Sequence, residues 1–195
     1  MPKKRTKKYK RVTKETNISL DLCLDGEGKY TIDTGIVFFD HMLTHIAKHG
    51  GFNLTLKASG DKIPDFHHLI EDVGIALGES FNEALADKKG INRYGFASCP
   101  MDESQVSVSL DFSGRPYLVY DLPLNKKKVG DIDEDTVEEF FKAFAGSAAA
   151  TVHIHTVCGK NPHHLVESAF KSFGRALKEA VKHGTKGIPS TKGVL

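Results

Sequence analysis

Cysteine is scarce in this sequence, and two kinds of long segment are missing from it. The three cysteines, Cys23, Cys99 and Cys158, stand far apart and form no CxxC pair, which argues against a disulfide framework or a cysteine-rich zinc site. No apolar run approaches the roughly 20 residues that cross a bilayer, and no signal peptide is recognisable. We therefore expect a cytoplasmic protein whose thiols are reduced and buried.

An excess of either charge is also absent from the chain as a whole. Lys and Arg number 27 and Asp and Glu number 25, so the formal charge is +2. Seven of the basic residues lie within residues 1–11, and without them the formal charge is −5. A mildly acidic body offers no broad surface for nucleic acid, and a short basic terminus is more often disordered. We expect residues 1–13 to form a flexible basic arm, nucleic acid not to be a partner, and deletion of residues 1–11 to leave turnover unchanged.

A histidine-rich motif, HHxxE, occurs twice. The first copy is His67-His68-Leu69-Ile70-Glu71, and the second is His163-His164-Leu165-Val166-Glu167, 96 positions later. Apolar residues at helical spacing follow each copy, which places the motif in the first turn of an amphipathic helix. There the first His and the Glu are i,i+4 neighbours, and the second His points about 100° round the axis. Each helix end can therefore present ligands in two directions.

The donors in these motifs are imidazole and carboxylate, without a thiolate. That set favours Mn, Fe, Co, Ni or Zn in a catalytic site. A single His-His pair is more often a solvated helix start, but two copies with the same Glu offset favour metal binding. Another helix, expected to end at Gly50-Gly51, carries His41, His45 and His49 at i, i+4 and i+8. This stripe also suggests a site, although each His alone is more often a surface residue.

The pattern of apolar residues divides the chain into two similar parts, 14–95 and 96–195. Alternating segments predict strands and 3.6-residue periodicity predicts helices, in the order β-β-α-β-α in each part. The two halves therefore predict a duplicated α+β fold with sheets packed against helices. The expected strands are 16–24, 29–32, 52–56, 106–112, 117–122 and 151–157, and the expected helices are 38–50, 67–87, 135–150 and 163–183.

Several longer motifs occur in a fixed order along nearly the whole chain. Besides the two HHxxE motifs they are Thr34-Gly35, Phe38-Phe39-Asp40-His41-Met42-Leu43, His49-Gly50-Gly51-Phe52, Lys89-Gly90-Ile91-Asn92-Arg93, Ser113-Gly114-Arg115-Pro116 and Pro189-Ser190-Thr191-Lys192-Gly193-Val194-Leu195. In these motifs the sequence resembles the imidazoleglycerol-phosphate dehydratases of histidine biosynthesis. The resemblance implies a hydro-lyase that converts imidazole glycerol phosphate to imidazole acetol phosphate. It also implies two Mn(II) ions per active site and a large homo-oligomer with sites between subunits.

The resemblance further implies roles for individual residues. One metal would take His41, His68, His163 and Glu167, and the other His67, Glu71, His164 and Glu139. Glu15 matches a substrate-contacting Glu, to which we assign acid–base work. The residues expected to hold the phosphate are Arg93, Arg115, Ser190 and Lys192, and Thr191 is a further expected substrate contact. The remaining substrate contacts would be His41, His49, His67, Glu71, His163 and Lys171.

Three positions depart from the family pattern. Glu139 stands where family members carry the His of a His-Phe-Phe run, Phe66 stands where Asp usually precedes the histidines, and Thr191 replaces a Ser. Glu is an acceptable oxygen ligand for Mn(II), so Glu139→His is expected to keep or raise metal affinity and activity. His45 falls where the family is variable and is left out of both ligand sets.

The expected chemistry suits such a site. The carbon that loses a proton is not acidic and hydroxide is a poor leaving group, but metals on the imidazole nitrogens stabilise an imidazolate that can expel the hydroxyl. Two alternatives stay open. A dinuclear metal hydrolase would need a bridging carboxylate, for which no Asp-rich motif is present. An inactive metal-binding relative is suggested only by Glu139 and Phe66.

Overall fold

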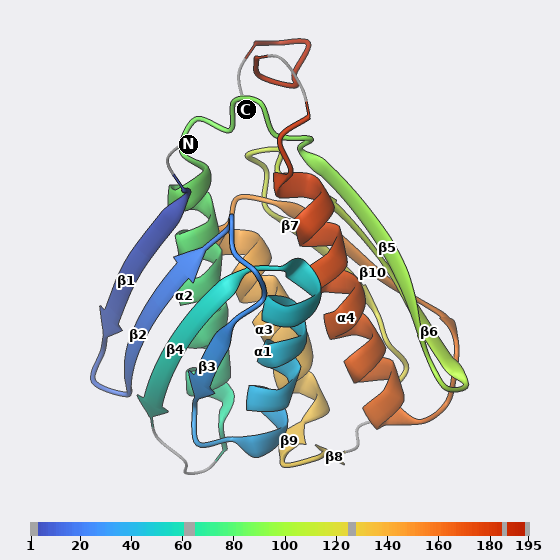
Figure 1. The fold of residues 1–195 in the computed structure, drawn as a ribbon. Helices are drawn as coiled ribbons and strands as arrows, with labels where there is room; N and C mark the ends of the chain where they lie inside the picture. Colours follow the sequence, from blue (N-terminus) through green and yellow to red (C-terminus); the bar gives the residue numbers. More distant parts are fainter. Residues whose placement is uncertain (1–3, 61–64, 125–127, 185–186, 194–195) are drawn as a thin grey trace.

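The computed structural model describes residues 4–60, 65–124, 128–184 and 187–193 (Figure 1). Within these residues the chain forms two four-stranded sheets, a short hairpin and four helices. The first half contains β1 (Thr6–Val12), β2 (Thr16–Cys23), β3 (Tyr30–Asp33), α1 (Val37–Gly50), β4 (Asn53–Gly60) and α2 (His67–Leu85). The second contains β5 (Tyr94–Met101), β6 (Ser104–Asp111), β7 (Tyr117–Asp121), β8 (Lys128–Val129), β9 (Ile132–Asp133), α3 (Glu134–Ser147), β10 (Thr151–Cys158) and α4 (Pro162–Val181).

The two sheets have the same topology. Their strand orders are β1-β2-β4-β3 and β5-β6-β10-β7, with the last pair parallel and the others antiparallel in each sheet. The α+β class and the duplication are therefore confirmed. Each half begins with one strand more than the sequence predicts, so the repeated unit is β-β-β-α-β-α. The additional strand of the second half, β5, starts at Tyr94, before the predicted boundary between residues 95 and 96.

The helices lie between the two sheets (Figure 1). Helix α2 packs on β1 and β2, and α4 packs on β5 and β6, while the helices pair across the halves as α2 with α3 and α1 with α4. Buried phenylalanine rings join these pairs: Phe39 contacts Phe140, and Phe140 and Phe141 contact Phe170. The two halves consequently share one core. None of the described helices has the length and apolar character of a membrane span.

The N-terminal segment differs from the expected flexible arm. Residues 6–12 pair with β2 in an antiparallel register, at the edge of the first sheet. The half-buried side chains of β1 each contact an acidic residue of α2: Lys7 with Glu83, Tyr9 with Glu79 and Arg11 with Asp72. The expectation failed because these inward side chains are long and polar, so the strand shows no apolar alternation. Residues 1–3 of the predicted arm lie outside the described range.

All four helices begin at the same end of the molecule, at the bottom of Figure 1. The two HHxxE motifs occupy the first turns of α2 and α4, as predicted. The side chains of Asp65 and Asn161 accept hydrogen bonds from the backbone N–H of His67 and His163, over 2.9 and 3.0 Å. Each of these side chains lies two positions before its histidine pair, so the two helix starts share this hydrogen bond, although only Asn161 is the N-cap of its helix. The C-terminal segment lies at the opposite end (Figure 1).

Candidate metal centre and anion site

Three donor side chains converge where α1 meets the start of α4. The Nε2 atoms of His41 and His45 lie 3.5 and 3.4 Å from the two carboxylate oxygens of Glu167 and 3.3 Å from each other. Nε2 of His163 lies 3.3 Å from the same carboxylate. In a site with metal–ligand bonds of about 2.1 Å, neighbouring donor atoms are about 3 to 3.4 Å apart. The donor types and their spacing therefore fit a first-row divalent metal.

Charges around Glu167 keep its carboxylate ionised. Its side chain is only 8% exposed, and burial by itself would raise the pKa. The Lys171 ammonium, 2.6 Å away, together with His45 and His41, outweighs burial and lowers the pKa of Glu167 to about 2. Burial chiefly, with help from the neighbouring cations, lowers the pKa of His45 to about 4. At neutral pH the cluster thus offers an anionic carboxylate and a neutral imidazole, the forms that bind metal.

The start of α2 is more open. His67 Nε2 lies 3.9 Å from Glu71 Oε2, and these side chains are 40% and 41% exposed. His68 faces Glu15 instead, with 3.6 Å between Nδ1 and Oε2. Phe66, which precedes the pair, packs partly against the core. This end therefore presents its donors outward rather than into a closed cluster.

Glu139 lies on α3, the helix that packs against α2. Its carboxylate oxygens are 3.1 and 3.2 Å from Lys142 Nζ, and this contact, with a weaker contribution from Glu71, raises the pKa of Lys142. Glu139 and Glu71 are therefore both close enough to act on one ammonium group. Glu139 is paired with a cation on its own helix, and its role as a metal ligand stays a prediction.

His164, at the start of α4, is held by the turn between β5 and β6. Its Nδ1 lies 2.7 Å from Glu103 Oε2, and its Nε2 lies 3.7 Å from Asp102. The hydrogen bond with Glu103 raises the pKa of His164. The same contact, with Ser104 second, lowers the pKa of Glu103 to about 2. Sequence reasoning missed Glu103, although its signal was present: it stands one residue before β6, as Glu15 stands one residue before β2.

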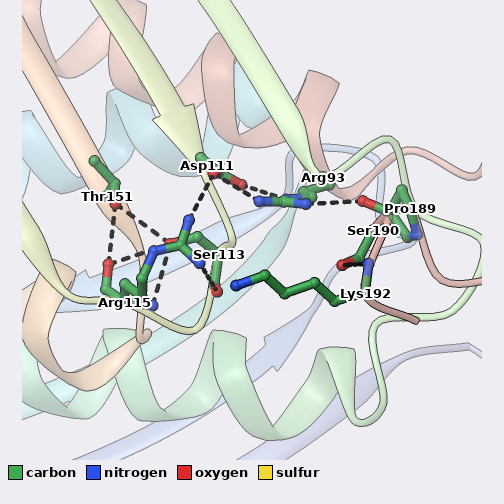
Figure 2. A network of polar contacts seen from close by, with 8 residues as sticks. All are labelled: Arg93, Asp111, Ser113, Arg115, Thr151, Pro189, Ser190 and Lys192. Carbon is green, nitrogen blue, oxygen red and sulfur yellow. Dashed lines mark hydrogen bonds and ion pairs between the residues drawn. The ribbon is translucent and has the colours of Figure 1, made fainter. Parts of the chain in front are cut away.

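The predicted phosphate-binding residues gather at the other end of the molecule. Three separate segments line a hollow of about 640 Å³, and they contribute Arg93, Tyr94, Arg115, Pro189, Ser190, Thr191 and Lys192. Figure 2 shows Arg93 anchored by two hydrogen bonds to the Asp111 carboxylate, at 2.6 and 3.0 Å, and one to the Pro189 carbonyl at 2.8 Å. Arg115 is 71% exposed. Arg93 thus fixes the C-terminal segment, and Arg115 and Lys192 supply accessible positive charge.

The candidate metal donors and this basic hollow are far apart within one chain. The backbone N–H of Arg93 bonds the carbonyl of Ala180 in the last turn of α4, whereas His163 lies in its first turn. A rise of 1.5 Å per residue puts about 25 Å between these turns. Within one chain, neither predicted set of four metal ligands comes together. His68 faces Glu15 rather than His41, and His164 faces Glu103 rather than Glu71.

The positions of His45 and His49 test the prediction that the histidine stripe on α1 marks a site. The stripe predicts a site, and His45 does join the cluster with His41 and Glu167, although family resemblance left it out. His49 lines a separate hollow of about 860 Å³ with Arg175 and Lys178. Its pKa is lowered, first by burial and then by Lys171 and Arg175. The stripe on α1 therefore leads from the candidate metal cluster to a hollow that Arg175 and Lys178 of α4 help to line.

Known proteins match this chain over almost its full length. The family model described as imidazoleglycerol-phosphate dehydratase matches residues 34–177. The imidazoleglycerol-phosphate dehydratase of Desulforamulus reducens is 54% identical over 98% of each chain, and that of Clostridium acetobutylicum is 53% identical over 99% of each. The crystal structure of IGPD from Pyrococcus furiosus in complex with (S)-C348 has a TM-score of 0.85 and 39% identity, covering 96% of this chain and 100% of that one. The Staphylococcus aureus enzyme has a TM-score of 0.82 and 39% identity, with 92% and 99% coverage.

These matches confirm the resemblance inferred from the motifs and the predicted enzyme class, a hydro-lyase. They set aside the dinuclear hydrolase. The chain belongs to the imidazoleglycerol-phosphate dehydratase family.

Proposed function

We propose that this enzyme removes water from imidazole glycerol phosphate, giving imidazole acetol phosphate in histidine biosynthesis, with two Mn(II) ions per active site. The observation that carries the metal dependence is the convergence of His41, His45 and Glu167 at donor spacing, with His163 3.3 Å from the same carboxylate. When bound, Mn(II) would supply Lewis acidity that stabilises negative charge on the substrate's imidazole ring.

The proton transfer falls to Glu15. Its side chain is 52% exposed beside His68, so it can reach a substrate while a positive or polar neighbour holds it. The reaction removes a proton from one carbon and hydroxide from the next, and the resulting enol rearranges to the ketone. Glu15 is the group that exchanges protons with the substrate, a role worth about 10²- to 10⁴-fold in rate.

The phosphate would be held in the hollow formed by Arg93, Arg115, Ser190, Thr191 and Lys192. Since that hollow lies about 25 Å from the start of α4 along the helix, a small substrate cannot reach both places on one chain. The imidazole and the phosphate of one substrate molecule are therefore bound by different subunits. His49, Lys171 and the two HHxxE motifs would complete the contacts.

A homo-oligomer is also supported by the outer face of the second sheet. Tyr94 and Phe96 of β5, Tyr117 of β7 and Val157 of β10 are each more than half exposed. They are spread over the face, with β6 and β10 between Tyr94 and Tyr117, and large exposed apolar side chains on one face favour its cover by another chain. The expected burial of the thiols is wrong, because Cys23 and Cys99 are half-buried and Cys158 is exposed. All three are free, and a reducing compartment, the cytoplasm, remains our proposal.

The decisive experiment measures dehydration of imidazole glycerol phosphate by metal-stripped protein, before and after Mn(II) is added. We expect turnover only with Mn(II). Release of inorganic phosphate is followed in the same samples, because a hydrolase would produce it and a dehydratase would not. Protein that binds Mn(II) without turning over the substrate would be an inactive relative, and Glu139→His and Phe66→Asp would then be the first variants to assay.

A further inference from the structure

Glu103 occupies the position in the second half that Glu15 occupies in the first. The sheets have the same strand order, so the β5–β6 hairpin corresponds to the β1–β2 hairpin. Glu15 is the residue before β2 and Glu103 the residue before β6. Each carboxylate faces the second histidine of an HHxxE motif, Glu15 facing His68 and Glu103 facing His164. The correspondence is therefore one of position and of contact.

The two contacts differ in how firmly they are made. Glu15 lies 3.6 Å from His68, whereas Glu103 lies 2.7 Å from Nδ1 of His164. The other carboxylate oxygen of Glu103 accepts hydrogen bonds from the Ser104 hydroxyl, at 2.9 Å, and the Asn161 backbone N–H, at 3.1 Å. Both oxygens of Glu103 are thus engaged, and this carboxylate is fixed to the loop that starts α4.

We infer that Glu103 is a positioning residue: it holds the His164 ring through Nδ1 and leaves Nε2 as the atom that binds metal. A carboxylate behind a metal-binding imidazole fixes the tautomer and the orientation of the ring, and its loss typically costs 10- to 100-fold in metal affinity. Duplication has thus given one carboxylate position two tasks, proton exchange at Glu15 and ligand orientation at Glu103. The inference rests on the proposed role of His164 as a ligand.

The experiment is a titration of metal-stripped protein with Mn(II), in which free Mn(II) is counted by electron paramagnetic resonance. In Glu103→Ala we expect the Mn(II) dissociation constant of one class of sites to rise 10- to 100-fold, with kcat at saturating Mn(II) within a few fold of wild type. Glu103→Gln keeps an acceptor for Nδ1, so a smaller rise is expected. Glu15→Gln should give the opposite result, with unchanged Mn(II) affinity and a kcat lowered by about 10²-fold or more.

Two controls separate orientation of His164 from a general effect on the loop. Ser104→Ala removes another hydrogen bond of the same carboxylate and should leave Mn(II) affinity unchanged. In a His164→Asn background, Glu103→Ala should cause no further loss, because the two act as one unit. The inference would be overturned if Glu103→Ala bound Mn(II) as tightly as wild type. It would also be overturned if Glu103→Ala weakened Mn(II) binding as much in the His164→Asn background as in wild type, or if Ser104→Ala weakened it as much as Glu103→Ala does. Failure of the wild-type protein to bind Mn(II) would instead refute the proposed function.

Discussion

The two HHxxE helix ends share a scaffold but have different surroundings. At the start of α4, Glu167 is 8% exposed and is approached by His41 and His45 from α1. At the start of α2, Glu71 is 41% exposed, and the neighbouring helix α3 brings Glu139, paired with Lys142. The comparison teaches that duplication preserved the helix starts, whereas the helix packed alongside decides whether donors converge within one chain.

Replacing Glu167 by Gln should reveal the largest difference between the two HHxxE helix ends. The change leaves Lys171 and His45 beside a neutral amide in a closed site, so the metal-free protein should lose about 2–3 kcal/mol of stability and Mn(II)-dependent turnover should disappear. Glu71→Gln should also abolish turnover but change metal-free stability by no more than about 0.5 kcal/mol. Thermal unfolding of the stripped proteins checks this, and equal destabilisation would show that the two ends are not different.

Deletion of residues 1–11 tests how much the N-terminal strand stabilises the fold. The deletion removes all of β1 except Val12, its contacts with α2 and the Arg5 contact with Val181, so a loss of about 2–4 kcal/mol of stability is expected, although the sequence predicts unchanged turnover. Deletion of residues 1–4 is the control, because Arg5 and β1 remain. An unchanged melting temperature in the longer deletion would mean that the strand contributes nothing.

Gly74→Ala tests how closely α2 must pack against α3. A Cβ at Gly74 would lie 2.7 Å from the Phe140 carbonyl oxygen, whereas Gly146 has nothing within 4 Å. We expect Gly74→Ala to cost about 1–3 kcal/mol by forcing the helices apart, and Gly146→Ala to stabilise by about 0.5–1 kcal/mol through helix propensity. Chemical denaturation measures both, and a neutral Gly74→Ala would show that the close approach is not required.

Arg5→Ala tests the tie between the first sheet and the end of α4. Arg5 hydrogen-bonds Asp25 and lowers its pKa, so the pair stabilises the folded state above the ordinary Asp pKa of about 3.9 and this contribution is lost as the pH falls through the lowered value. The variant should be less stable by about 1–2 kcal/mol at pH 7, and the difference should shrink in acid below about pH 4. A difference that does not change with pH would exclude the ion pair as its cause.

Glu139→His should have the smallest effect. The variant places an imidazole on α3, the helix beside α2. Because α1 already places imidazoles beside the start of α4, the two HHxxE helix ends become more alike. Mn(II) affinity should stay the same or rise by up to about tenfold, with turnover retained. Loss of metal binding in a correctly assembled variant would show that Glu139 does not belong to the ligand set.

Periodicity in the sequence was sufficient to predict the four helices, six strands and the duplication. It failed at β1, where Lys7, Tyr9 and Arg11 replace apolar side chains, because the partner of each lies on α2, more than 60 positions away. It also failed at β5, whose Tyr94 and Phe96 point outward and are exposed. Strand prediction from alternation assumes an apolar inner face, and neither edge strand has a regular one.

The positions of the candidate donors on their helices were predictable from the sequence, but the arrangement of those helices was not. Helical spacing places His163 and Glu167 on one face, as found at 3.3 Å. Spacing along the chain carries no information on which helices pack together, so the convergence of His41 and His45 on Glu167, and the separation of Arg93 from His163, required the structure. Glu103 was overlooked because its importance depends on a hairpin that was itself not predicted.

The contact of Arg5 with the end of α4 has a consequence for synthesis of the chain. Its guanidinium donates to the carbonyl oxygen of Val181 over 2.6 Å, 176 positions away. At 5–20 residues per second, roughly 10–35 s separate the two residues during translation. Strand β1 can pair with β2 and α2 earlier, but the contact of Arg5 with α4 can form only after Val181 has been synthesised. We expect nascent chains to remain open to chaperones and proteases until α4 leaves the ribosome.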